Sequence, residues 1–372
     1  MMTRRRFIAT VVIGGAGVAV AEYTLNVRGA RSQYEALAQR TWRHTQGGLS
    51  TDPARMLECV RYATLAPSSH NTQCWKFKIG ENAVSILPDF QRRCPVVDPD
   101  DHHLFVSLGC ATENLIQAAS ANGLRAVASF NMDGDESVDI ALEPSKPVVS
   151  PLFEAIPLRQ STRGEFDGKP IASAELKVLE KAGSGNGVRV HLLTERKAIE
   201  KVVDFVIQGN TAQMRDRAFV QELKDWIRFN GAHAAKTGDG LFSGSSGNPS
   251  VPIWLGRIMF GLFFRETSEN DKYARHIRSS AGIAVFVSER DDKDHWVETG
   301  RAFERFALQA TVLGIRNAHL NQPVEVQSIR PEFASFLNVG GKRPDLVVRF
   351  GRGPEMPRSL RRPLENVIFE RA

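Results

Sequence analysis

Two arginines four positions apart are the residues of this chain whose types and spacing most clearly suggest chemistry. Arg159 and Arg163 flank Ser161 in the run R-Q-S-T-R. Arginine is always charged and presents a planar fork of donors that matches phosphate or carboxylate oxygens. Hydrogen bonds to charged groups contribute about 1.5–3 kcal/mol each, so two arginines and a hydroxyl could hold a phosphate firmly. Taken alone, the run is equally compatible with a solvated basic helix end.

A second polar segment lies at residues 66–75, which read A-P-S-S-H-N-T-Q-C-W. Pro67 ends the helix predicted over 54–66, because a proline disfavours helical backbone in the residue before it. The turn that follows presents hydroxyl and amide side chains, which suit the polar edge of a flat heterocycle: Ser68, Ser69 and Asn71. An ordinary helix-ending turn is the alternative. We interpret His70 as an incidental neighbour rather than a base.

An internal repeat indicates how these segments are positioned. Seven residues recur at a constant offset of 191 positions: Asp101, Gly109, Ala111, Glu113, Ala119, Gly123 and Arg125 match Asp292, Gly300, Ala302, Glu304, Ala310, Gly314 and Arg316. Apolar residues of the first copy fall at spacings of four, three and four, which predicts an amphipathic helix. Gly123 and Gly314 then stand where a helix end favours a left-handed residue. Duplication of an ancestral unit is the better interpretation of the repeat.

The pattern of helices and strands predicts an α+β fold with two repeated units in one chain. The first unit, residues 51–150, reads helix, strand, strand, long helix, strand, strand. The second unit fills residues 151–372, with strands expected near 188–193, 283–287 and 346–350 and helices between them. The two units are expected to share one extended core.

One segment departs from this order. Residues 231–252 are rich in glycine and serine and form an unusually long connection, and 253–264 follow as an apolar amphipathic helix. We predict a lid over about 231–264; an ordinary core helix is the first alternative. Membrane contact is the second, although Arg257 and Arg265 are few for a membrane-surface helix.

The N-terminus carries a targeting pattern. Residues 3–8, T-R-R-R-F-I, match the twin-arginine export motif, and an apolar stretch over 8–21 ends in A-V-A. We predict a signal peptide over 1–21, a linker and lead-in helix over 22–50, and a periplasmic or exported protein. An uncleaved anchor is the alternative, but about fourteen apolar residues fall short of the roughly twenty that span a bilayer. Contact with the membrane is therefore expected only during export.

Composition and cysteine spacing give no support to nucleic-acid binding or to a metal site. The net charge of +6 falls to +3 without the three leader arginines, and no basic run with interleaved aromatics favours nucleic acid. The four cysteines show no metal-ligand spacing, and an exported protein could pair them in three ways, among which the sequence does not choose: Cys59, Cys74, Cys94 and Cys110. We predict no metal site.

Together, the two polar segments resemble the nitroreductase family, in which R-R-S-x-R and P-S-x-x-N-x-Q-P-W reach one flavin mononucleotide (FMN) from two partners. The run L-N-Q-P-V-E at 320–325 and the basic tail at 349–363 are most similar to the fused, pseudo-dimeric Acg-like branch. The resemblance implies that FMN is held by the turn and by the arginine run: Pro67, Ser68, Ser69, Asn71, Arg159, Ser161 and Arg163. It also places Arg361 or Arg362 near the phosphate, and we favour Arg362.

Each unit contains only one of the two motifs. The second unit reads G-S-G-N at 183–186 where the first has its serine-rich turn, and R-T-W-R at 40–43 is a poor match to the arginine run. We therefore predict one FMN per chain and no need for a homodimer. Gln160 and Cys74 depart from the family pattern, which favours a specialised or weakened enzyme.

The resemblance implies an FMN-dependent oxidoreductase that takes hydride from NAD(P)H or another donor. Nitroaromatic or quinone-type acceptors are the expected substrates. The alternative is a non-catalytic protein that sequesters FMN under the lid, because NADPH is scarce outside the cytoplasm.

Overall fold

The computed structural model describes residues 31–45 and 51–369. The predicted signal peptide and the first part of the predicted linker lie outside the described residues. Residues 31–41, within the predicted linker and lead-in segment, are helical. Within the described part of the chain, no helix combines the length and apolarity needed to cross a membrane.

The first half builds a four-stranded antiparallel sheet with the order β1-β2-β4-β3. Its elements follow the predicted sequence: α2 (Asp52–Ala63), β1 (Trp75–Ile79), β2 (Ala83–Pro88), α3 (His102–Ala121), β3 (Leu124–Phe130) and β4 (Val138–Pro144). Alternate residues of β4, such as Val138 and Ile140, are buried in the core that contains α3. The period of two in burial shows that one face of this sheet packs and the other meets solvent.

The second half builds a second sheet, also antiparallel, with the order β5-β8-β10-β9. Its main elements are α4 (Pro151–Ala155), α5 (Ser173–Ala182), β5 (Val188–Leu193), α6 (Arg196–Arg215), α10 (Glu266–Arg278), β8 (Gly282–Ser288), α11 (Lys293–Val312), β9 (Arg316–His319), α12 (Gln322–Glu325), α13 (Arg330–Leu337) and β10 (Pro344–Gly351). Every residue of β8 and β10 is buried. Ala284 and Phe286 join the α3/α11 core, whereas Ile283 and Val285 join a second core with α6 and α10. Both faces of this sheet are therefore covered.

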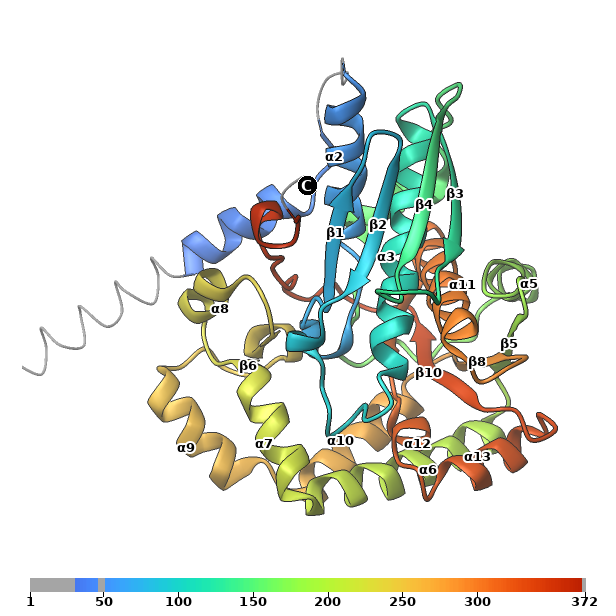
Figure 1. Cartoon of the computed structure of the whole chain (residues 1–372). Helices are drawn as coiled ribbons and strands as arrows, with labels where there is room; N and C mark the ends of the chain where they lie inside the picture. The colour runs from blue at the N-terminus through green and yellow to red at the C-terminus, as the bar shows by residue number, and fades with distance from the viewer. Residues whose placement is uncertain (1–30, 46–50, 370–372) are drawn as a thin grey trace, which may run out of the picture.

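A smaller group of elements forms a flank of the molecule (Figure 1). It contains α7 (Arg217–Trp226), β6 (Ile227–Arg228), α8 (Gly231–Thr237), β7 (Leu241–Phe242) and α9 (Ile253–Phe263). The helix at 31–41 joins this group, because the Tyr34 ring packs on the Phe242 ring, tilted by 37° at 4.4 Å between centroids, and shares a core with Ala234. The amphipathic helix that the sequence predicts over 253–264 is present as α9.

Helices α3 and α11 lie between the two sheets and cross with their backbones in contact (Figure 1). A Cβ atom on Gly109 would lie 1.9 Å from the carbonyl oxygen of Val297, and one on Gly300 would lie 1.9 Å from that of Val106. The two contacts are reciprocal and differ by the offset of the repeat. Only glycine permits an approach this close, so these two positions set the distance between the halves.

The α+β class predicted from the sequence is confirmed, and both sheets run through their strands in the same order. All four cysteines are free and buried. Burial raises the pKa of Cys59 and Cys74 to about 12, so these thiols are protonated and unreactive at neutral pH.

We predict that Gly109→Ala lowers the stability of the protein by about 3 kcal/mol or more, because the new methyl group meets backbone that cannot move aside. The midpoint of thermal unfolding measures the change. Gly261→Ala in α9 is the matched control, since nothing lies within 4 Å of its Cβ position. That control should gain up to about 1 kcal/mol from helix propensity. Equal midpoints for Gly109→Ala and wild type would contradict the crossing described above.

Candidate functional site

The turn after α2 has a strained backbone. His70, Asn71 and Gln73 have φ values of 50°, 54° and 55°, in the left-handed region that non-glycine residues avoid. The backbone N–H of Gln73 donates to the Ser68 hydroxyl at 2.9 Å. Left-handed residues of this kind persist where the surroundings hold them, and they concentrate at functional sites.

Distant segments hold this turn in place. The Asn71 amide donates to the carbonyl oxygens of Gly240 at 3.0 Å and Leu360 at 3.2 Å. The Gln73 amide donates to the Gly238 carbonyl at 2.9 Å. The serine-rich turn is therefore tied to the predicted lid segment and to the C-terminal tail.

The arginine run lies along strand β9 of the second sheet. Ser161 forms a parallel bridge with Asn317, and the N–H of Thr162 donates to the Asn317 carbonyl at 2.8 Å. Buried Arg349 donates to the carbonyl oxygens of Thr162 and Gly164. These bonds fix the extended segment in which Ser161 and Arg163 lie.

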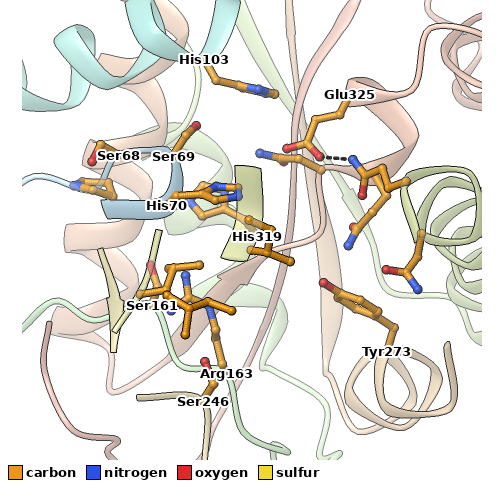
Figure 2. A pocket seen from close by; sticks show the side chains of 18 of the residues that line it. Ser68, Ser69, His70, His103, Ser161, Arg163, Ser246, Tyr273, His319 and Glu325 are labelled. Atoms are coloured by element: carbon orange, nitrogen blue, oxygen red, sulfur yellow. Dashed lines mark hydrogen bonds between the residues drawn. The ribbon is translucent and has the colours of Figure 1, made fainter. Parts of the chain in front are cut away.

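The turn and the run meet at one cavity of about 320 Å³ (Figure 2). Five of the eight predicted cofactor-binding residues line it: Pro67, Ser68, Ser69, Ser161 and Arg163. The first three belong to the first half of the chain and the other two to the second half. The volume lies within the range of roughly 300–1,000 Å³ that is usual for small-molecule sites.

Three histidines that the sequence analysis did not assign to the site also line this cavity: His70, His103 and His319. His70 follows the serines, and His319 ends β9 (Figure 2). Their ring nitrogens His70 Nε2 and His319 Nδ1 are buried without a hydrogen-bond partner among the described residues. Unpaired buried polar atoms are rare in proteins, and here they identify positions where a ligand could bond.

Burial and the nearby Arg163 guanidinium keep the imidazoles of His70 and His319 neutral. Burial, then Arg163, lowers the pKa of His70 to about 4. Burial, then His103 and Arg163, lowers the pKa of His319 to about 3. At neutral pH Arg163 is thus the charged group on this side of the cavity, while the histidines each offer one donor and one acceptor.

The opposite side of the cavity is formed by α10 and α12. Glu325 accepts a hydrogen bond from the Gln213 amide at 2.7 Å, and burial raises the pKa of the Glu325 carboxyl. Burial raises the pKa of Tyr273 to about 12, so its hydroxyl remains a donor. Figure 2 shows both side chains across the cavity from the histidines. Glu325 ends the run 320–325, which the sequence analysis used only as a family signature.

The other three predicted residues do not line the cavity. Asn71 ties the turn to its neighbours as described. Arg159 is buried and its Nε lies 3.1 Å from the Glu304 carboxylate, while its Nη2 donates to the Leu65 carbonyl. Arg362 donates to the carbonyl oxygens of Gln73 and Asn366. A cofactor-binding role for these three stays a prediction.

Arg361, rather than Arg362, lies with Asn71 and Arg159. Its guanidinium donates to Asn71 Oδ1 at 2.9 Å and to the Leu65 carbonyl at 2.9 Å. Arg159, Arg358 and Arg361 all pack around Trp42, at 6.0, 5.3 and 4.7 Å from the ring centroid. Burial raises the pKa of their neighbour Glu304 to about 7, so this cluster has more positive than negative charge. An excess of buried positive charge favours the binding of an anion beside it.

One group of potential metal ligands includes His103, which lines the cavity. Asp98, His102 and His103 bring their ligand atoms within 4.8 Å of one another. Asp98 accepts the backbone N–H groups of His103 and Leu104 and so caps α3, and His102 Nε2 lies 2.9 Å from Asp345. These hydrogen bonds show that the three side chains hold the start of α3 in place. We therefore assign no metal to the group.

No model of a known protein family matches the chain. The chain is 25% identical over 317 residues to "Putative NAD(P)H nitroreductase Rv3131" of Mycobacterium tuberculosis, which covers 82% of this chain and 88% of that protein. It is 22% identical over 327 residues to "Putative NAD(P)H nitroreductase acg" of the same species, covering 84% and 95%. This similarity supports the relationship to the nitroreductase family that the motifs indicate.

Solved structures of nitroreductases align with part of the chain. The FMN-dependent nitroreductase NfnB from Mycobacterium smegmatis matches 58% of this chain and 96% of that chain, at 11% identity and a TM-score of 0.38. A nitroreductase with bound FMN from Desulfitobacterium hafniense matches 60% and 98%, at 15% identity and a TM-score of 0.38. Both TM-scores are below 0.5, so this likeness carries no information about a ligand of this chain.

Proposed function

We propose that this protein is an FMN-dependent oxidoreductase of the nitroreductase type. The observation that carries the proposal is the meeting of the serine-rich turn with Ser161 and Arg163 at one cavity. The relatives named as NAD(P)H nitroreductases support the same class of reaction. When bound, FMN supplies two-electron chemistry, and the protein supplies binding, orientation and electrostatics.

The residues at the cavity fit a flat, polar and anionic group. Ser68, Ser69 and Ser161 offer hydroxyl groups, and His70 and His319 offer ring nitrogens that lack protein partners. Arg163 would hold negative charge that develops on the heterocycle during reduction, an effect that is strong in a buried site. The cations around Trp42 would serve the phosphate, with Arg361 in the place that the sequence analysis gave to Arg362.

The hydride donor and the nitro acceptor are proposed from the names of the relatives, and the quinone-type acceptor is proposed from the motif resemblance. NAD(P)H is the proposed donor, and nitroaromatic or quinone-type molecules are the proposed acceptors. The aromatic wall of the cavity, Phe260 and Phe264, suits a flat apolar acceptor and limits the access of water.

A second candidate function is the sequestering of FMN without turnover. Residues of the predicted lid segment favour it, because Leu241, Ser243 and Phe260 line the cavity. A segment that covers the reactive face of the cofactor would exclude donor and acceptor alike. The relatives' names favour turnover, so we place this candidate second.

We also propose that the two halves are diverged copies that pair as a dimer would. The shared strand order and the reciprocal glycine contacts at an offset of 191 support this origin. A single complete site, one FMN per chain and a functional monomer follow from it. Export by the twin-arginine route belongs to the same proposal, since that route carries folded proteins and suits one that takes up FMN in the cytoplasm.

We predict that Arg163→Ala weakens the binding of FMN about 10- to 100-fold, because one charged hydrogen bond is lost. Fluorescence titration of the apoprotein with FMN measures the affinity. Arg125→Ala is the matched control, since Arg125 is an exposed arginine paired with Glu143 on the first sheet. If Arg163→Ala binds FMN as tightly as wild type, the cavity is not the FMN-binding site.

Rapid mixing of the FMN-loaded protein with NADH or NADPH separates the two candidate functions. The oxidoreductase predicts loss of the oxidised-flavin absorbance within seconds, followed by its return when a quinone is added. Absorbance that stays constant for minutes with both nicotinamides would favour the sequestering protein.

We predict that the chain is exported and loses residues 1–21. Replacing Arg4 and Arg5 by lysine should retain it in the cytoplasm, and Arg6→Lys should not. Cell fractionation with mass determination of the exported chain measures both effects. An equal distribution of the three forms would contradict the export proposal.

A further inference from the structure

Helix α9 presents a stripe of large apolar side chains to solvent. Trp254, Ile258 and Leu262 are 65%, 52% and 54% exposed, and Phe263 beside them is 67% exposed. The first three stand four positions apart and therefore lie on one face of the helix. Scattered exposed apolar residues are ordinary, but a continuous stripe marks an interaction surface.

The opposite face of α9 is already used by the protein itself. The backbone at Gly256 is pressed against Phe229, where an added Cβ would come within 2.4 Å of the ring. Phe260 and Phe264, one and two turns further on, stack at 4.3 Å and line the cavity. The helix therefore cannot turn its exposed stripe inward without giving up a wall of the cavity.

The surroundings of the stripe are positively charged. Lys236, Arg257 and Arg265 are exposed, and residues 240–265 contain no aspartate or glutamate. Glu266, which follows directly, is neutralised by an ion pair with Arg215 at 3.0 Å. The nearest acidic residue before this segment, Asp239, is buried and paired with Arg228. Lys236 and Arg257 also border a groove of about 850 Å³ between α8 and α9, next to Trp254. Two cations beside a tryptophan at the edge of an apolar stripe match the boundary between lipid headgroups and acyl chains.

The start of the described chain lies on the same flank. The helix at 31–41 packs through Tyr34 on Phe242 and Ala234, next to α8 (Figure 1). The thirty residues before it contain Arg4, Arg5 and Arg6, the apolar stretch 8–21 and Arg28. The first described helix, which follows the predicted leader, thus belongs to the flank that carries α9.

We propose that the outer face of α9, with Lys236 and Arg257, is a docking surface for an anionic lipid bilayer. The helix lies in the plane of the interface, Trp254, Ile258, Leu262 and Phe263 enter the acyl region, and the cations contact lipid phosphates. This assignment takes up the alternative that the sequence analysis placed second for residues 253–264, and Lys236 on α8 adds a cation that the helix itself lacks. Docking in this way places the cavity, which shares α9 as a wall, next to the bilayer.

Co-sedimentation of the purified chain with vesicles tests the proposal. Vesicles of phosphatidylcholine with and without phosphatidylglycerol are compared at low and high salt. We expect binding that increases with phosphatidylglycerol and falls with salt, since surface charges are screened. Trp254→Ser/Ile258→Ser should bind about tenfold less, and Lys236→Gln/Arg257→Gln should lose the preference for phosphatidylglycerol.

Val148→Ser/Val149→Ser is the matched control, because these valines are also exposed, at 58% and 59%, and lie outside the flank. The control should bind like wild type. Equal binding of Trp254→Ser/Ile258→Ser and the control would overturn the proposal, as would no binding by wild type. A wild-type dimer in sedimentation velocity that Trp254→Ser/Ile258→Ser dissociates would also overturn it, because a second copy would then cover the stripe.

Discussion

The backbone contact between α3 and α11 is the constraint on which the rest of the structure depends. Because Gly109 and Gly300 have no side chains, the two helices approach until backbone meets backbone. That distance sets the separation of the two sheets. It also places the end of α2, from one half, beside the segment that holds Ser161 and Arg163, from the other. A cavity between halves needs this precision, since a shift of one side-chain diameter would separate its two walls.

Desolvation governs the chemistry of the site. It holds His70 and His319 neutral, with pKa values lowered to about 4 and about 3, and it raises the pKa of Glu304 to about 7. The same low dielectric strengthens the interaction of Arg163 with any anion that enters. The strained backbone at 70–73 is tolerated because side-chain hydrogen bonds to the carbonyl oxygens of Gly238, Gly240 and Leu360 hold the turn in place.

The sequence predicted the parts of the structure that are encoded locally. The repeat at an offset of 191 located α3 and α11, and hydrophobic patterning located most strands to within two residues. Five of the eight residues that were predicted to bind the cofactor line the cavity, three from the turn and two from the arginine run. The unpredicted features depend on tertiary contacts. His319 ends β9 directly before the run 320–325, which served as a family signature without pointing to the histidine. The partner of Arg159 is a repeat residue, Glu304, and only the packing of the helices brings the two together. That Arg361, rather than Arg362, donates to Asn71 depends on the path of the tail, which the sequence does not specify.

The central claim is that two halves of one chain build one complete flavin site. The direct measurement is the amount of FMN released per mole of denatured protein, with the chain purified as a monomer after saturation with FMN. The account predicts a ratio near one. A ratio near two would show that each half keeps its own site, and a ratio near zero would show that the cavity does not bind FMN.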